Sequence, residues 1–286
     1  MSPINTRAKA ELFLLSITFI WGSTFAISKF LLGFITPLAY IGIRFTIATV
    51  LFSLMFAKDI RALTRGAALK GGILGTLLFL GFAVQTIGLQ HTTASKSAFI
   101  TGMMVVFTPI CQLVLERRAP KLGNIVGVVL VTIGLYLLTS PAGSEFNIGD
   151  ALNLVGAFLF ALYIVYLDMF SKDHNTIQLT FMQFISTAIL GGATAGAFEQ
   201  VAVNFSNESL LALAYLAVFA SVIALYIQTR YQKDSTPTRA AVIFSIEPVI
   251  AASFAYVLLG EVIGILGVIG GGIILAGLLV SELSPG

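Results

Sequence analysis

The stretch TRAAVIFSIEPVIAASFAYVLLG, from Thr238 to Gly260, decides the fold class. It is apolar along most of its length, yet Glu247 and Pro248 stand side by side near its centre. A helix of about twenty residues at 1.5 Å per residue crosses a hydrocarbon core about 30 Å thick. A carboxylate and a helix-breaking imine are costly in the middle of such a helix, so they need a structural or functional reason.

The composition of the whole chain is that of a membrane protein. Of its 286 residues, 57% are hydrophobic and only 10% are charged, against roughly 25% charged residues in soluble domains. The mean hydropathy is +0.98. Basic cytoplasmic loops account for the net charge of +3, so we expect a lipid bilayer and no nucleic acid as the partner. Cys111 is the only cysteine, which excludes a disulfide framework.

Apolar runs predict an all-α membrane protein with ten transmembrane helices. Counted this way, thirteen of the sixteen Lys and Arg residues fall on one side of the membrane, which predicts that both termini are cytoplasmic. The ten runs lie at about 10–32, 36–57, 67–90, 96–115, 121–139, 149–168, 175–197, 209–229, 238–259 and 262–281.

Ten spans divide into two groups of five, residues 1–143 and 144–286. Because five is odd, the second group enters the membrane from the opposite side, so we expect two inverted five-helix repeats. Glycines and basic residues recur at a constant separation of half the chain length, which supports this division. This half-chain separation relates Lys96 to Arg239, Gly127 to Gly270 and Gly134 to Gly277.

Two ionisable residues lie deep in the predicted spans. Arg44 and Glu247 differ in depth by only about 5 Å, so we expect a buried charge pair between the halves. Such a pair either only fixes the packing of the halves or lines a wet cavity. A proton-carrying role for Glu247 is less favoured, since a neighbouring arginine would keep its carboxylate ionised.

Pro109 and Pro248 lie inside the fourth and ninth spans. Proline removes a helical hydrogen bond, so we expect kinks near the middle of the membrane. Their occurrence in both halves favours a hinge over a static kink.

Aromatic and neutral polar residues near the middle of the spans are candidates for a substrate cavity. We expect the apolar part of a substrate to contact Phe79, Phe82, Phe99 and Tyr163, and its polar part to bond Ser23, Gln85, Thr101 and Ser245. Each has a structural alternative, because Phe also faces lipid and Ser or Thr also bonds its own helix. Since the sequence has no metal-ligand spacing, phosphate-binding loop or catalytic cluster, we expect no cofactor, no metal and no enzyme activity.

Three motifs, WGSTF (Trp21–Phe25), TTASKSAFITG (Thr92–Gly102) and TPTRAAVIFSIEPVIAASFAYVLLGE (Thr236–Glu261), resemble the EamA-type exporters of the drug/metabolite transporter superfamily. The similarity covers the whole chain, although LERRAP stands in the first half where the second has Leu-Gly-Glu. The resemblance implies a carrier of the bacterial inner (plasma) membrane that moves amino acids or similar metabolites outward through a cavity between the halves.

We therefore expect a secondary transporter or facilitator that exports small amphipathic metabolites, first of all hydrophobic or aromatic amino acids, by alternating access. The expected partner is a small-molecule substrate, and a monomer suffices for this role. Two alternatives remain open: a proton-coupled drug or nucleotide-sugar carrier, and, from another class, a lipid scramblase or membrane enzyme.

Overall fold

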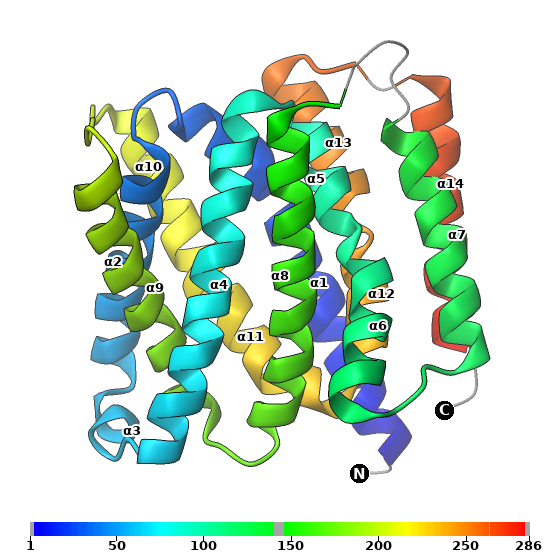
Figure 1. The fold of residues 1–286 in the computed structure, drawn as a ribbon, viewed down its shortest axis with the longest axis horizontal. Coiled ribbons are helices and arrows are strands. Elements are labelled where there is room, and N and C mark those ends of the chain that lie inside the picture. Colours follow the sequence, from blue (N-terminus) through cyan, green and yellow to red (C-terminus); the bar gives the residue numbers. More distant parts are fainter. Residues whose placement is uncertain (1–2, 140–145, 263, 284–286) are drawn as a thin grey trace.

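The computed structural model describes residues 3–139, 146–262 and 264–283, which form a bundle of helices (Figure 1). In chain order the elements are α1 (Pro3–Leu31), α2 (Pro37–Met55), α3 (Ala57–Arg61), α4 (Arg65–His91), α5 (Ala94–Gly102), α6 (Met104–Glu116), α7 (Leu122–Thr139), α8 (Ile148–Ser171), α9 (Thr176–Phe198), α10 (Asn207–Tyr215), the π-helix η1 (Leu216–Ile223), α11 (Ala224–Tyr231), the 3-10 helix η2 (Gln232–Asp234), α12 (Pro237–Phe244), α13 (Glu247–Leu259) and α14 (Ile265–Leu283).

Eight helical segments of the described chain are long and apolar enough to cross a membrane. Two further apolar helices, Leu122–Leu137 and Ile265–Gly277, are shorter. The expected all-helical membrane architecture is thereby confirmed, whereas the number of crossings remains a prediction.

Polar residues fix where the helices begin. The Asn147 side chain accepts a hydrogen bond from the backbone of Asp150, and the Asp150 side chain accepts one from the backbone of Asn147, so a capping box starts α8. Glu199, which follows α9, reaches across to α2 and accepts hydrogen bonds from the backbone N–H groups of Leu38 and Ala39. A carboxylate at this position satisfies unpaired N–H groups and complements the positive end of the helix.

Two spans are interrupted near their middle. α5 ends and α6 begins around Met103, and α12 ends and α13 begins around Ser245 and Ile246. Proline accounts for one of these breaks, because Pro248 is in the first turn of α13 and has no N–H group to continue the helix. The other break differs from the expectation: α6 runs through Pro109, and the interruption at Met103 comes before it in the chain.

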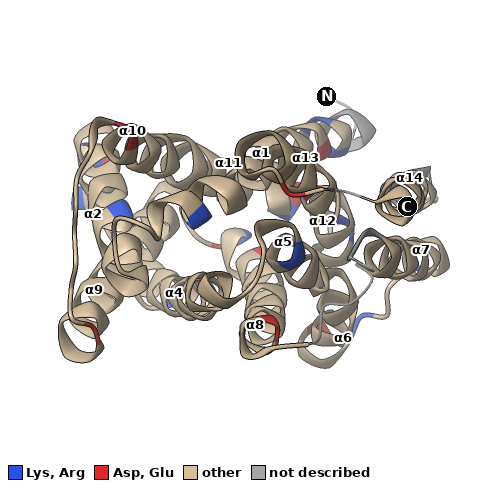
Figure 2. Cartoon of the chain, turned by 90° about the horizontal axis from the view of Figure 1, so that it is seen from above, with Lys and Arg blue, Asp and Glu red and all other residues tan. Residues whose placement is uncertain are grey.

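A pair of helices, α7 and α14, lies at one edge of the bundle, where the two pack side by side (Figure 2). Glycines permit the close approach. A Cβ atom on Gly134 would lie 2.6 Å from the carbonyl oxygen of Gly270, and one on Gly277 would lie 2.9 Å from that of Gly127. Small residues let helix backbones approach in this way inside membranes.

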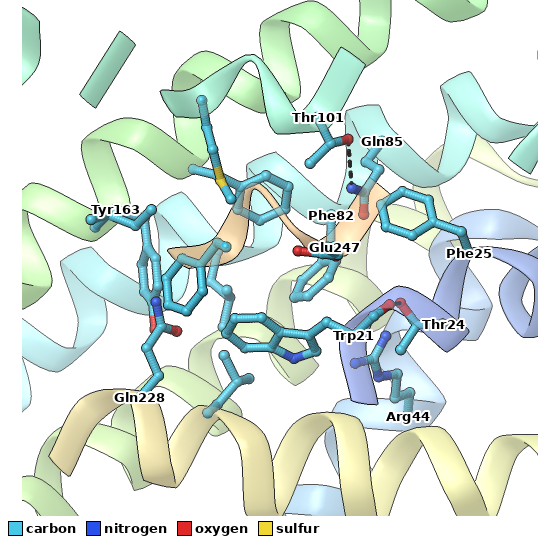
Figure 3. A pocket seen from close by; sticks show the side chains of 16 residues that line it. Trp21, Thr24, Phe25, Arg44, Phe82, Gln85, Thr101, Tyr163, Gln228 and Glu247 are labelled. Carbon is cyan, nitrogen blue, oxygen red and sulfur yellow. Dashed lines mark hydrogen bonds between the residues drawn. The ribbon is translucent and has the colours of Figure 1, made fainter. Parts of the chain in front are cut away.

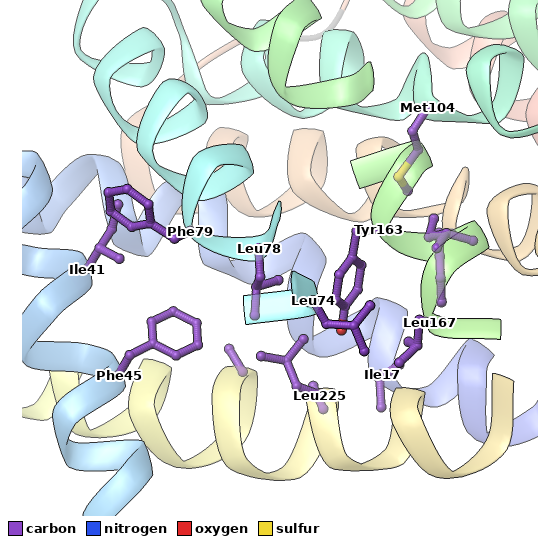
Figure 4. Close-up of a cluster of buried hydrophobic side chains, with 14 of the residues drawn as sticks. Ile17, Ile41, Phe45, Leu74, Leu78, Phe79, Met104, Tyr163, Leu167 and Leu225 are labelled. Atoms are coloured by element: carbon purple, nitrogen blue, oxygen red, sulfur yellow. The ribbon is translucent and has the colours of Figure 1, made fainter. Parts of the chain in front are cut away.

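The largest cluster of buried apolar side chains extends between helices that include α1, α2, α4, α8, α9 and α11 (Figure 4), and it reaches α7 and α14 through Val131, Leu135 and Ile274. Aromatic rings make up much of it: Phe45 contacts Phe82 and Phe184, with ring centroids 5.5 and 6.0 Å apart. Leu78, Tyr163 and Leu225 belong both to this core and to the wall of a cavity at the centre of the bundle.

Candidate functional site: a central cavity

A cavity with an empty volume of about 540 Å³, part of it open to solvent, lies between helices of both halves of the chain (Figure 3). Its wall combines aromatic rings, aliphatic side chains, amides, hydroxyls and opposite charges. The lining residues are Trp21, Thr24, Phe25, Arg44, Leu78, Phe82, Gln85, Thr101, Met104, Phe160, Tyr163, Ile164, Leu225, Gln228, Phe244 and Glu247.

Many lining residues come in pairs related by the half-chain separation. The two halves therefore present corresponding positions to the same space. The pairs are Trp21 with Ile164, Phe82 with Leu225, Gln85 with Gln228, Thr101 with Phe244, and Met104 with Glu247. The two helix breaks obey the same separation, since it joins Met103 to Ile246.

The cation of the cavity is Arg44, which is 3% exposed and extends from α2. Its Nε atom donates a hydrogen bond to Ser221 Oγ over 2.8 Å, and Nη1 donates to Tyr40 OH over 3.0 Å. Ser221 lies in the π-helix η1, and its hydroxyl donates to the carbonyl of Leu216 in the preceding turn. π-helical turns are frequent at functional sites, and here one turns a hydroxyl toward the arginine.

The carboxyl group of the cavity belongs to Glu247, the first residue of α13, which directly follows the helix break. The expected ion pair between Arg44 and Glu247 is not formed in this structure: the ion pairs within the described ranges do not include it. Instead two hydroxyl groups hold the guanidinium, which also lies 5.1 Å from the centre of the Phe82 ring. Both charges nevertheless line one cavity.

Half of the predicted substrate contacts are in the cavity wall. Phe82 belongs to it, and Gln85 donates a hydrogen bond to Thr101 over 2.9 Å (Figure 3). Tyr163 lines it as well and donates its hydroxyl proton to Gln183 Oε1 over 2.6 Å.

The structure places the other predicted contacts away from this wall. Ser23 donates to the carbonyl of Ile20 and shares a hydrogen bond with Tyr215 OH, and Ser245 is bonded to the carbonyl of Val242 at the helix break. Phe79 is buried in the apolar core, and Phe99 packs against that core. Ser23 and Ser245 therefore take the structural alternative of bonding their own helix, whereas Phe79 and Phe99 contribute to the apolar core instead of facing lipid or the cavity.

Sequence reasoning missed several aromatic and amide residues of the wall. Trp21 is the chain's only tryptophan, and its Nε1 atom donates to the carbonyl of Ala220. Gln228 could have been identified from the sequence, because it is a polar amide within an apolar span. It is 2% exposed. Phe25 and Phe244 carried no signal that separated them from lipid-facing phenylalanines, whereas Phe160, which also lines the cavity, lies near the middle of its span as expected of a cavity aromatic.

Two ion pairs lie outside the cavity, toward opposite ends of the bundle. Arg239 Nε is 2.8 Å from Glu11 Oε1, and Lys96 Nζ is 2.6 Å from Asp150 Oδ2. Each pair ties the start of a broken span, α12 or α5, to the first helix of the other half, α1 or α8.

In each of the two ion pairs the carboxylate also accepts a hydrogen bond from a hydroxyl group. Glu11 accepts a hydrogen bond from Ser235, and Asp150 accepts one from Thr92. Thr92 and Ser235 are themselves related by the half-chain separation, so the two halves use the same device at corresponding places. Among the described residues, no three His, Cys, Asp or Glu side chains come together as a metal site.

Comparison with known proteins agrees with a two-part chain. An uncharacterised transporter of Archaeoglobus fulgidus is 34% identical over 278 residues, which cover 97% of this chain and 87% of that protein. A protein of Chlamydia muridarum named S-adenosylmethionine/S-adenosylhomocysteine transporter is 25% identical, over 85% of this chain and 82% of that one. A solved crystal structure with 19% identity superposes with a TM-score of 0.81 over 97% of both chains, which shows a shared fold. The model of the EamA-like transporter family matches twice, over residues 8–140 and 147–283, so the protein is a member of the EamA-like transporter family.

Proposed function

We propose that this transporter exports small amphipathic zwitterions, in particular hydrophobic or aromatic amino acids. The observation that carries the proposal is the presence of Arg44 and Glu247 on one cavity without an ion pair between them. Two opposite charges that do not neutralise each other are complementary to a ligand that carries both signs.

Arg44 suits the carboxylate of such a ligand. A guanidinium has five N–H donors, and two of its nitrogen atoms already bond Ser221 and Tyr40, which hold the group in place. The remaining donors are able to bind a carboxylate in the planar geometry that arginine favours. Glu247 supplies an acceptor for the ligand's ammonium group.

The aromatic side chains of the wall suit an apolar or aromatic side chain on the ligand. Rings stack on rings at centroid distances of about 4.5–7 Å and gain free energy beyond their buried area. The solutes named for the Chlamydia relative, S-adenosylmethionine and S-adenosylhomocysteine, carry the same amino-acid group joined to an aromatic adenine. They are therefore the second set of candidate substrates.

We further propose that all ten apolar helices cross the bacterial plasma membrane, with both termini cytoplasmic and residues 1–143 and 144–286 as inverted repeats. The paired lining residues and the paired helix breaks, all related by the half-chain separation, support this arrangement. Transport then proceeds by alternating access, in which the two halves expose the shared cavity to each side in turn. The charges and helix breaks would take part in that motion.

Counterflow in proteoliposomes tests the substrate. We expect L-phenylalanine, L-tryptophan and L-leucine to exchange, whereas phenethylamine, which lacks the carboxylate, and 3-phenylpropionate, which lacks the ammonium, should exchange poorly. Arg44→Gln should lose the preference for L-phenylalanine over phenethylamine, and Glu247→Gln should lose the preference over phenylpropionate. S-adenosylmethionine and S-adenosylhomocysteine form a second panel. If none of the zwitterions exchanges, or if both variants keep the wild-type order of preference, the proposal is refuted.

A further inference from the structure

The two glutamines of the cavity occupy corresponding positions but make different contacts. Gln85 on α4 donates across the cavity wall to Thr101 on α5. Gln228 on α11 donates instead to Gln232 Oε1, one helical turn further along, over 3.0 Å. The first amide therefore joins two helices beside the cavity, whereas the second points along its own helix toward the end of the bundle where α1 begins (Figure 1).

Gln232 continues this contact to a second helix. It is fully buried, and its Nε2 atom donates to the carbonyl oxygen of Ile164 on α8 over 2.7 Å. Ile164 lines the cavity, so the bond joins α8, directly beside the cavity, to η2, which follows α11. One residue further, Lys233 Nζ donates to the carbonyl of Ser171, also on α8. The amide chain therefore bridges the two helices between the cavity and that end of the bundle.

The other half of the chain bridges the corresponding helices with a different group. The residue that the half-chain separation relates to Gln232 is Leu89, whose side chain is apolar, and there Lys29 Nζ on α1 donates to the backbone carbonyl oxygens of Leu89 and Thr92 over 2.6 and 2.7 Å. One end of the bundle is therefore held by an ammonium group and the other by a pair of neutral amides. Hydrogen bonds between neutral groups contribute less net free energy than hydrogen bonds to a charged group, so the amide bridge is the one that opens more easily.

One atom of the Gln228 side chain, the acceptor Oε1, is available to a ligand. It is 2% exposed and faces the cavity (Figure 3), yet its Oε1 atom has no hydrogen-bond partner within the described residues. A buried acceptor without a donor is unfavourable, so a ligand that brings an N–H or O–H group gains affinity there. The ammonium group of the proposed ligand is assigned to Glu247, which leaves Gln228 for a neutral donor.

We propose that Gln228 and Gln232 close the cavity toward the end of the bundle where α1 begins, and that Gln228 also recognises a neutral N–H or O–H donor on the substrate. The second part rests on the proposed function and sharpens it to amino acids whose aromatic side chain carries a donor, such as the indole of tryptophan. The first part rests on alternating access alone. Because one side chain makes both contacts, substrate binding and closure are coupled through a single amide.

One-sided thiol labelling tests the closure. A reporter cysteine at the cavity residue Met104, in a Cys111→Ala background, is exposed to an impermeant maleimide in membrane vesicles of each orientation. We expect Gln232→Leu, which installs the residue of the other half, to speed labelling from the α1 end about tenfold, the effect of one hydrogen bond. Labelling from the opposite end should not change. Gln232→Asn, which shortens the amide, should act in the same direction.

The matched control is Asp234→Asn in the same short helix. Its carboxylate forms a partly exposed ion pair of 3.7 Å with Arg230, and we expect the wild-type labelling rate. Equal rates for Gln232→Leu and the wild type refute the closure, and so does acceleration from both ends, which indicates general loosening of the bundle.

A comparison of two ligands tests whether Gln228 recognises a neutral donor. The ligands are L-tryptophan and 3-benzothienyl-L-alanine, in which sulfur replaces the indole N–H. We expect the wild type to bind tryptophan about tenfold more tightly, and Gln228→Met to bind both equally. A preference that survives in Gln228→Met refutes the role of Gln228. If the wild type binds neither compound, the proposed function fails together with that role, while the labelling still decides the closure.

Discussion

Gly102 and Pro248 touch where the two broken spans pass each other. A Cβ atom on Gly102 would lie 2.9 Å from Cγ of Pro248 and 3.3 Å from a methyl group of Leu135. Gly102 ends α5, and Pro248 is in the first turn of α13. The interruption in one half therefore packs against the proline of the other.

Gly102→Ala should destabilise the protein because the added methyl group has no space beside the rigid proline ring. Overpacking of this kind costs about 1–3 kcal/mol, which a lower midpoint of thermal unfolding in detergent would report. Gly272→Ala is the matched control, since no atom lies within 4 Å of the added Cβ. Equal midpoints for the two variants would show that the contact relaxes freely.

The ion pair between Glu11 and Arg239 should stabilise the contact between the two halves. Both side chains are only 6% exposed, and breaking a buried ion pair costs about 3–5 kcal/mol. Because Glu11 also pairs with Arg7 over 3.1 Å, removal of Arg239 should cost less than removal of Glu11. We expect Glu11→Gln and Arg239→Gln each to lower thermal stability, and the double variant to recover part of the loss. Strictly additive losses would mean that the pair contributes no coupling. Asp234→Asn, which removes the exposed pair with Arg230, serves as the control and should change little.

Pro248→Ala should fold and insert normally but slow transport. The alanine restores an N–H group near the carbonyl of Phe244, which favours a straight helix and therefore one orientation of the halves. Pro109→Ala should have a weaker effect, because α6 is not interrupted at Pro109. Turnover of L-phenylalanine in proteoliposomes measures both effects. Wild-type turnover in the double variant would reduce these prolines to static features.

Accessible cysteines should report the predicted topology. Lys58 on α3 and Glu208 on α10 are exposed at opposite ends of the bundle (Figure 1). With cytoplasmic termini, a cysteine at Glu208 should react with an impermeant thiol reagent in intact cells, and one at Lys58 should not, both in a Cys111→Ala background. The opposite pattern would invert the orientation in the membrane, and labelling of both would contradict the assigned spans.

The sequence predicted the features that depend on the length and spacing of apolar segments and on the free-energy cost of a charge inside them. The apolar helical segments and the half-chain separation of the glycines follow from composition and spacing, whereas the contact between the glycines of α7 and α14 was not predicted. Arg44 and Glu247 were identified as residues of one site because a charge inside a span is costly in any membrane protein.

The neighbours of those charges were not predictable. Tyr40 and Ser221 hold Arg44, and Ser221 is placed for this contact by a π-helix, which has no clear sequence signature. Depth alone indicated that Arg44 and Glu247 lie at a similar level, but it carried no information on the direction of either side chain around its helix. The same limit explains why Phe82 lines the cavity while Phe79, nearly one turn earlier, lies in the core.

The contact between α7 and α14 has a consequence for how such a chain arises. Gly134 meets Gly270 and Gly277 meets Gly127, while Gly127 corresponds to Gly270 and Gly134 to Gly277. The two glycine contacts are therefore equivalent: exchanging the halves converts one into the other. The same relation holds between two identical subunits across a twofold axis. A single ancestral half already encodes both sides of this contact. Gene duplication followed by fusion would preserve it without any new residue, and a later substitution in one copy would alter one of the two glycine contacts and leave the other intact.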